Sequence, residues 1–82
     1  MQKRLATLSI FMKNKTDVEK VNKIIGDFSK MIVSRMGIPY KEKEIAIIVL
    51  ILDGTNDEIG ALSGKLGNLK EISVKTAISK IV

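Results

Sequence analysis

The residues that could perform chemistry in this chain are few, because its 82 residues include neither histidine nor cysteine. These absences remove the usual general base near neutral pH, disulfide bonds, and the imidazole and thiolate ligands of zinc, copper and iron–sulfur centres. Carboxylates alone can bind magnesium or calcium, but no run of aspartate and glutamate resembles such a site. The sequence therefore predicts a protein that is not an enzyme and that carries no cofactor or metal.

One glycine-rich string, at residues 60–67, resembles a phosphate-binding loop. Its glycine spacing is one residue short, and Lys65 is followed by Leu66 where a serine or threonine would bind magnesium. Gly60, Gly64 and Gly67 instead predict a stripe of small residues along a helix, which permits close approach to the sheet, to the other helix or to another subunit. Packing is therefore the favoured interpretation of this string, and ligand contact is the alternative.

Polar side chains and free backbone amides occur at the expected starts of two helices. A helix start favours an anion, because its first N–H groups have no partner within the helix and its dipole is positive there. Helix capping is the favoured role for these residues, and ligand binding is the candidate function. The candidate ligand-binding residues are Asn14, Thr16, Asp17, Gly54, Thr55 and Asn56.

The first third of the chain predicts a strand followed by a helix. Residues 4–13 place alternate side chains on two faces, as in a strand. Thr16 and Glu19 have the spacing of a capping box, so a helix is expected from there to about Ser29. Its apolar stripe consists of residues at spacings of three and four, namely Val18, Val21, Ile24, Ile25 and Phe28.

The middle of the chain predicts a hairpin of two unequal strands. Residues 31–38 mix polar and apolar side chains, which suits an edge strand, and Gly37 with Pro39 is expected to close it. Residues 40–43 form a polar hairpin connection. The run 45–52 is apolar on both faces, which predicts a central strand that is covered on both sides and ended by Asp53 and Gly54.

A second helix and a last strand complete the chain. Thr55 and Glu58 repeat the capping-box spacing, and Gly67 followed by Asn68 is typical of a helix end. Residues 72–78 alternate again, as in a strand. The inward-facing side chains of this second helix are expected to be Ile59, Leu62 and Leu66.

The order of these elements predicts an α+β fold, the ferredoxin-like βαββαβ sandwich. Two right-handed crossovers place both helices on one face of a four-stranded antiparallel sheet, with the first and third strands in the middle. A chain of 82 residues has room for one domain, at 1–82. This fold hosts many unrelated functions, so it does not identify one.

The face of the sheet without helices needs another cover, because neither alternating set of the strand 45–52 is polar. An exposed apolar patch of several hundred Å² usually marks a contact surface, so we expect a homo-oligomer, a dimer or a tetramer. The alternative is that the hairpin and residues 80–82 fold across this face. The candidate interface residues are Leu5, Phe11, Ile45, Ile47, Val49 and Ile51.

The charge of the chain is positive, since 14 lysine and arginine residues outnumber 9 acidic ones and give a net charge of +5. The basic residues are spread along the sequence, which favours a solvated basic surface over a nucleic-acid site. Nucleic-acid binding remains the alternative function, although Phe11 alone offers an aromatic platform on the two central strands. The longest apolar run, 45–52, is shorter than the roughly 20 residues of a membrane helix. With no signal-peptide pattern, a cytoplasmic protein is expected.

Five segments carry a family resemblance: Asp27-Phe28-Ser29, Arg35-Met36-Gly37-Ile38-Pro39-Tyr40, Ala46-Ile47-Ile48, the string Ile59–Gly67, and Val74-Lys75-Thr76. The chain resembles the iron-only hydrogenase system regulator family, which is related in fold to ACT-like regulatory domains and to the C-terminal domain of the nickel-responsive repressor. The resemblance implies an oligomeric regulatory or ligand-sensing subunit of a hydrogenase system, with a small-molecule effector or a regulatory protein as partner. Nickel sensing is not implied, because residues 31–38 lack histidine and cysteine.

Overall fold

The computed structural model describes residues 2–13 and 17–81. Four strands form one antiparallel sheet in the order β2-β3-β1-β4, which confirms the predicted ferredoxin-like sandwich with β1 and β3 in the middle. The elements are β1 Lys3–Met12, α1 Val18–Asp27, β2 Ile32–Tyr40, β3 Ile45–Thr55, α2 Asn56–Gly67 and β4 Ile72–Ile78, with short 3₁₀ turns η2 at Ser29–Met31 and η3 at Lys41–Lys43.

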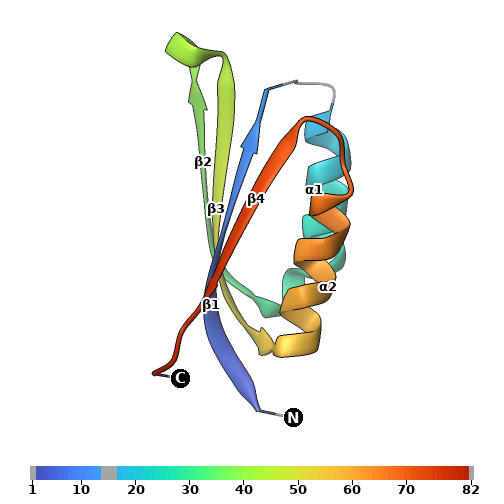
Figure 1. Ribbon diagram of the computed structural model, residues 1–82, viewed down its shortest axis with the longest axis vertical. Coiled ribbons are helices and arrows are strands. Elements are labelled where there is room, and N and C mark those ends of the chain that lie inside the picture. Colours follow the sequence, from blue (N-terminus) through green and yellow to red (C-terminus); the bar gives the residue numbers. More distant parts are fainter. Residues whose placement is uncertain (1, 14–16, 82) are drawn as a thin grey trace.

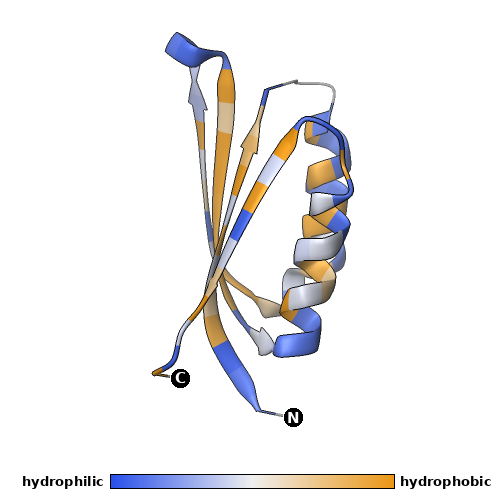
Figure 2. Ribbon diagram, in the orientation of Figure 1, coloured by the Kyte–Doolittle hydropathy of each residue, from blue (hydrophilic) through white to orange (hydrophobic). Residues whose placement is uncertain are grey.

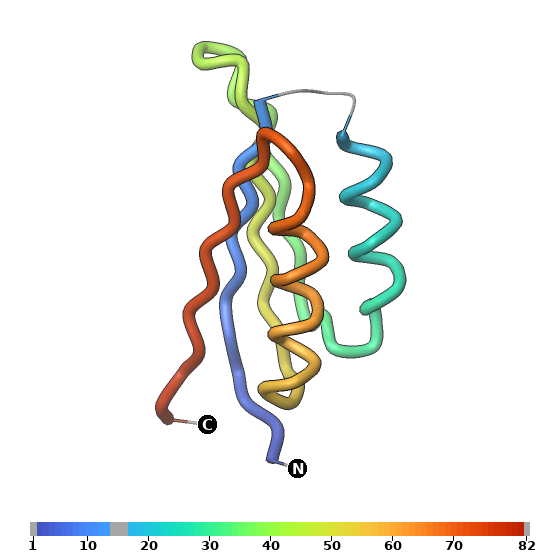
Figure 3. Tube along the Cα trace, turned by 45° about the vertical axis from the view of Figure 1, so that its right-hand side comes forward, coloured from blue at the N-terminus to red at the C-terminus, as the bar shows by residue number. Residues whose placement is uncertain are grey.

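Both helices lie on the same side of the sheet, as predicted (Figure 1). They run side by side in front of the strands (Figure 3). Because α1 follows β1 and α2 follows β3, and these two strands are antiparallel, the two helices begin at opposite ends of the sheet.

The core fills the space between the sheet and the helices. Even-numbered residues of β1 and β3 face the helices, so Leu8, Ile10, Leu50 and Leu52 are completely buried. From α2, the three predicted residues Ile59, Leu62 and Leu66 meet them, and Val21 does so from α1. Within the described ranges no polar or charged side chain is buried.

The edge strand β2 is longer than the sequence indicated. Gly37 and Pro39 do not close it, because pairing with β3 continues to Tyr40, which lies opposite Ile45. A proline is compatible with this position because an edge strand needs backbone donors on only one side. A bulge between Ile32 and Ser34 marks the other end of the strand.

The central strand β3 is also longer than predicted. Asp53 and Gly54 do not end it, because β1 supplies pairing partners for them, Leu5 and Arg4. The polar connection predicted at residues 40–43 is shorter by one residue, because Tyr40 still belongs to β2; it is the turn η3, followed by Glu44 in the left-handed region at φ 54.

The capping box at the start of α2 is confirmed. The backbone N–H of Thr55 donates to Glu58 Oε1 at 2.8 Å, and the N–H of Glu58 donates to the Thr55 hydroxyl at 3.2 Å. The helix ends at Gly67 as expected, but Asn68 is right-handed, and the left-handed residue of this connection is Glu71 at φ 60. The predicted capping box of Thr16 with Glu19 lies partly outside the described residues.

Candidate interface on the open face of the sheet

We call the side of the sheet without helices the open face. Strand alternation places every predicted interface residue on it, because the odd-numbered positions of β1 and β3 point away from the helices. The open face consists of Lys3, Leu5, Thr7, Ser9 and Phe11 on β1, Ser34, Met36, Ile38 and Tyr40 on β2, Ile45, Ile47, Val49, Ile51 and Asp53 on β3, and Ser73, Lys75 and Ala77 on β4.

The open face divides into an apolar half and a polar half. Strand β3 carries four consecutive β-branched side chains along it, and Phe11 lies opposite Ile47. Along the other central strand, Ser9 and Thr7 are opposite Val49 and Ile51. The colours of Figure 2 show that β3 is hydrophobic over most of its length, whereas the turn at its tip is hydrophilic.

Three apolar residues of this face were missed by sequence reasoning. Met36, Ile38 and Tyr40 of β2 have exposed fractions of 54%, 43% and 41%, and they lie opposite Val49, Ile47 and Ile45. Their spacing of two is a strand signal. Met36 and Ile38 lay within the predicted edge strand, which was not counted as part of the apolar face, and Tyr40 was assigned to the connection after it. They extend the apolar half to the edge of the sheet.

The hairpin of β2 and β3 projects beyond the helices as an arm (Figure 1). This follows from element lengths, because 11 residues of β3 span about 36 Å whereas 12 residues of α2 span about 18 Å. The helices can therefore cover only part of each long strand. We call residues 38–47 the arm.

Two hollows flank the point where β1 ends beside the arm. The first has a volume of about 360 Å³ and is lined by Pro39, Tyr40, Lys41, Glu44 and Ala46 together with Met12, Lys13 and Ile45. The second has a volume of about 300 Å³ and shares Met12, Lys13 and Ile45 with the first. Both are lined mainly by apolar atoms, so the end of β1 is an uneven, partly apolar surface.

Neither the hairpin nor the described residues after β4 cover the open face. The hairpin continues in the direction of its strands, and the residues after β4 leave the sheet on the side away from the helices without lying across it (Figure 1). Ile81 is 92% exposed. Val82, the last residue of the segment 80–82 considered above, lies outside the described residues.

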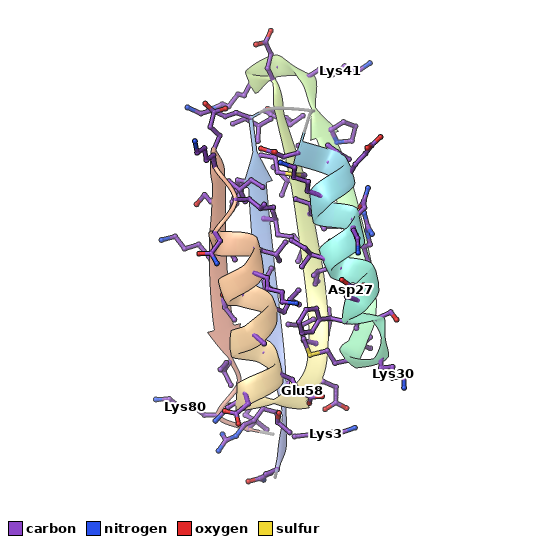
Figure 4. All side chains as sticks on the ribbon, turned by 90° about the vertical axis from the view of Figure 1, so that its right-hand side faces the viewer. Lys3, Asp27, Lys30, Lys41, Glu58 and Lys80 are labelled. Atoms are coloured by element: carbon purple, nitrogen blue, oxygen red, sulfur yellow. The ribbon has the colours of Figure 1, made fainter. Side chains whose placement is uncertain are left out.

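The described members of the two clusters predicted to bind a ligand lie at opposite ends of the sheet. Asp17 precedes α1 beyond the Met12 end of β1, whereas Thr55 lies opposite Lys3 at the other end. The labels of Figure 4 show the same separation, with Lys41 at one end and Lys3, Glu58 and Lys80 at the other. Asp17 therefore does not form one site with Thr55 and Asn56. Asn14 and Thr16 lie outside the described residues.

The cluster at Gly54, Thr55 and Asn56 has structural roles that the geometry explains. A Cβ on Gly54 would lie 2.9 Å from Met31 Sδ and 3.3 Å from Glu58 Oε1, so packing favours glycine there. Thr55 caps α2, and the hydrogen bonds from its backbone N–H and its side chain lower the pKa of the exposed Glu58 carboxyl. Asn56 is the first residue of α2.

Comparison with known families shows what kind of chain this is. Residues 4–76 match the family described as "TM1266-like: Iron-only hydrogenase system regulator, putative". The chain belongs to this family. Its member TM1266 from Thermotoga maritima, an uncharacterized protein of solved structure, is 41% identical, with a TM-score of 0.92 over 96% of this chain and 100% of that chain. No curated protein matches the chain.

Other solved structures share the fold of the TM1266-like family at low identity. CPII from Thiomonas intermedia K12, bound to ADP, AMP and acetate, is 12% identical, with a TM-score of 0.54 over 96% of this chain and 92% of that chain. The divalent ion tolerance protein CutA1 from Ehrlichia chaffeensis is 17% identical, with a TM-score of 0.51 over 98% of this chain and 85% of that chain. These likenesses concern the fold alone.

The glycine string that carried much of the family resemblance lies within α2. A Cβ added to Gly60, Gly64 or Gly67 would meet nothing within 4 Å, so the predicted close approach to the sheet or to α1 is not found. Lys65 lies over the ring of Phe28, with Nζ 5.5 Å from the ring centre. This cation–π contact connects α2 to the end of α1.

Two other features are absent from residues 2–13 and 17–81, a metal site and a membrane-spanning helix. No group of three or more acidic, histidine or cysteine side chains there is arranged to hold a metal ion. No helix in these ranges is long and apolar enough to cross a membrane.

Proposed function

We propose that this member of the TM1266-like family is a single regulatory domain, spanning residues 1–82, that acts as a homo-oligomer and has no enzyme activity of its own. In this proposal, copies associate through the open face, and the assembly modulates a partner protein of the hydrogenase system in response to a small effector. The absence of histidine and cysteine from the sequence supports a binding role over a catalytic one.

The single observation that carries the proposal is the apolar half of the open face. Phe11 and Ile51 are 39% and 36% exposed, and Met36, Ile38 and Tyr40 are more so. These side chains are contiguous across three paired strands, because they occupy facing positions of the register. Contiguous exposed apolar surface of this kind is typical of protein–protein contacts.

A second copy of the chain is the occupant that the charges favour. The whole chain carries a net charge of +5, but the open face carries one acidic residue, Asp53, and two basic residues, Lys3 and Lys75. A face with so few charges can meet its own copy with little overall like-charge repulsion, whereas the more highly charged surfaces of a basic protein repel their copies more strongly.

Substitution of Val49 by lysine tests the assembly. Val49 is half-buried at the middle of β3, so Val49→Lys would place a charge at the centre of the contact. We expect the unchanged protein to sediment as an oligomer and Val49→Lys to sediment as a monomer. The matched control is Val33→Lys, because Val33 is 63% exposed at the bulge of β2 and has no partner in the register. If the unchanged protein sediments as a monomer at micromolar concentration, the proposed assembly is wrong.

The effector part of the proposal is tested separately by thermal unfolding with candidate ligands. The first ligands to test are ADP and AMP, which the CPII structure contains, followed by amino acids. A specific ligand raises the Tm in proportion to the logarithm of its concentration above Kd. If none of them raises the Tm, the effector class is wrong while the assembly remains testable. Asp17, Thr55 and Asn56 are the positions to substitute once a ligand is found.

Nucleic-acid binding is the alternative function, because the chain is basic. Labelled lysines lie at both ends of the molecule in Figure 4, with Lys41 at one end and Lys3, Lys30 and Lys80 at the other. Binding to DNA or RNA that weakens steeply with salt would favour this alternative, since phosphate contacts release counterions.

A further inference from the structure

We propose that the outer edge of β4 receives an extended acidic segment of a partner protein as an added strand of the sheet. This inference rests on the proposed regulatory function for the existence of a partner, and it does not depend on the assembly through the open face. In strand addition, main-chain hydrogen bonds supply affinity and alternate side chains supply specificity.

The backbone of β4 leaves one row of donors and acceptors without a strand to pair with. Strand β4 is the last in the sheet order, and Figure 3 shows it at one side of the sheet. The N–H of Ser79 donates to the Leu5 carbonyl at 2.8 Å, in line with the register of β1 and β4. Because successive residues of a strand direct their backbone groups to opposite sides, the odd-numbered residues of β4 bond to β1. The outward-facing backbone groups are those of Ile72, Val74, Thr76 and Ile78, and among the described residues no backbone hydrogen bond outside the sheet involves them.

The two edges of the sheet differ in how well they suit strand addition. The outer edge of β2 contains Pro39, the one proline of the chain, whereas β4 contains none. A bulge interrupts β2, and the register of β4 with β1 runs without a shift from Ile72 to Ile78. An added strand therefore finds a continuous row of partners along β4.

The flank of α2 that borders β4 carries small residues. The hydroxyl groups of Thr76 and Ser63 are hydrogen-bonded at 3.1 Å, which locates this flank. Gly60 and Gly67 share the face of α2 with Ser63, since they are three and four residues away from it. A Cβ on either glycine would meet nothing within 4 Å. The small residues leave room beside the edge for the side chains of an added strand.

The side chains of β4 define what the added strand must offer. On the helix side, Ile78 is 45% exposed, and Ile72 and Val74 are half-buried. On the side of the open face, the exposed residues are Ser73, Lys75 and Ala77. Because residues directly opposite each other point to the same face, the segment needs apolar residues at alternate positions. Between them it needs a residue that complements Lys75.

The charge along β4 favours an acidic segment over a second copy of this chain. Residues 70–80 contain three lysines and one acidic residue, Glu71. A second copy paired antiparallel over the whole of β4 would place Lys75 against its own equivalent and Lys70 against Lys80. Like charges directly opposite each other destabilise a strand pair, whereas an aspartate or glutamate opposite Lys75 is attractive.

The acidic residues of α2 narrow the position of the complementary charge. Asp57 and Glu58 lie in the first turn of α2, directly after the end of β3, and this turn is nearest to the Ile78 end of β4. The acidic residues of the partner segment are therefore expected opposite Lys75 and toward Lys70, away from Ile78.

Synthetic peptides test the inference without the natural partner. The probe is a fluorescein-labelled peptide of about nine residues, SVTVEVTVS, which is long enough to span β4, and two further peptides carry glutamine or lysine in place of the central glutamate. We expect fluorescence anisotropy to show binding at least about threefold tighter for the glutamate peptide than for the lysine peptide. Lys75→Glu is expected to reverse this order. Lys20→Glu is the control, because it makes the same change of net charge on exposed α1.

Removal of one backbone donor tests whether the contact is a strand. Thr76→Pro removes an outward-facing N–H and leaves the bonds to β1 in place, so we expect binding of the glutamate peptide to weaken at least about tenfold. Thr76→Val is the matched control, because it keeps the N–H and lacks the hydroxyl that contacts Ser63, and binding is expected to stay within about threefold. Circular dichroism shows whether each variant is folded.

Methylation of the peptide backbone gives the same test without a protein variant. Only every second N–H of an added strand points toward β4. Of two glutamate peptides that are N-methylated at alternate sets of positions, we therefore expect one to bind and the other to lose binding. A peptide held by side chains alone would tolerate both patterns.

The outcomes separate this inference from the proposed function. Preference for the glutamate peptide, its reversal by Lys75→Glu and the loss of binding with one methylation pattern support strand addition at β4. If none of the peptides binds, if both methylated peptides bind, or if Val49→Lys abolishes binding while Thr76→Pro does not, this inference is wrong and the proposed assembly keeps its own test. If the unchanged protein is a monomer that binds the glutamate peptide as expected, the assembly is wrong and this inference stands.

Discussion

The two faces of β3 carry side chains of similar hydrophobicity in different surroundings. Leu50 and Leu52 are completely buried under the helices, whereas Ile51 between them is 36% exposed. A strand that is apolar on both faces needs two covers, and two short helices on one side supply only one. The comparison shows that apolar residues on both faces of a strand can indicate a contact surface for which the same chain supplies no covering element.

The largest expected effect is on the covered face. Leu50→Ala removes a completely buried side chain from the core, and we expect the free energy of unfolding to fall by about 3 kcal/mol at any protein concentration, because a cavity remains. Urea denaturation followed by circular dichroism measures this change. A loss below about 1 kcal/mol would mean that the covered face is not the core of the fold.

The neighbouring residue on the open face sharpens the comparison. Ile51→Ala is expected to cost less than about 1 kcal/mol in dilute solution, since its side chain is partly exposed there. The cost is expected to grow as protein concentration rises, because association stabilises only chains whose open face is complete. Denaturation at two protein concentrations a hundredfold apart measures this. If the loss of unfolding free energy in Ile51→Ala is the same at both protein concentrations, the open face does not take part in association and the proposed difference from the covered face is wrong.

Two glycines test how closely the covered face is packed. The Gly54→Ala substitution puts a Cβ 2.9 Å from Met31 Sδ, so we expect a loss of about 1 to 2 kcal/mol as the methionine side chain shifts. The matched control is Gly37→Ala on β2, where a Cβ meets nothing within 4 Å and stability is expected to stay or rise slightly. Equal thermal shifts in the two variants would contradict close packing around Gly54.

The smallest expected effect concerns the pH dependence of the α2 cap. Hydrogen bonds from Thr55 hold the pKa of Glu58 below its ordinary value of 4.5, so the ionised carboxylate stabilises the folded state above that pH, and this contribution is lost as pH falls through the lowered value. The glutamine side chain of the Glu58→Gln variant does not ionise, so this contribution to stability is missing at every pH. The difference in Tm between the two proteins should therefore shrink from pH 7 to pH 3. If the Tm of the two proteins changes with pH in parallel, the helix cap does not depend on the charge of the Glu58 carboxylate.

Much of the fold was predictable, because the periodicity of apolar residues and the helix-capping residues indicated the same order of strands and helices. Alternation identified β1 and β4, and the paired spacing of Thr55 and Glu58 located the start of α2 to the residue. The bounds of β2 and β3 were wrong, because strand ends depend on whether the neighbouring strand still offers partners. Gly54 illustrates this, since Arg4 lies opposite it.

The placement of the candidate interface residues on one face was predictable in part, whereas the separation of the two candidate ligand clusters was not. The apolar run of β3 identified the open face without showing which alternate set lies on it. The mixed polar and apolar pattern of the edge strand did not show that Met36 and Ile38 extend the apolar surface. The separation of Asp17 from Thr55 depends on the antiparallel course of β1 and β3, which only the assembled sheet defines.

The outer edge of β2 has a consequence for how large an assembly can become. Pro39 has no backbone N–H to offer, and the bulge leaves Val33 out of the ladder near the opposite end of the strand. An incoming strand would therefore find only a short stretch of free donors and acceptors between these two interruptions. Growth into an unlimited ribbon or fibre is disfavoured at this edge, which leaves a finite complex as the accessible form of self-association.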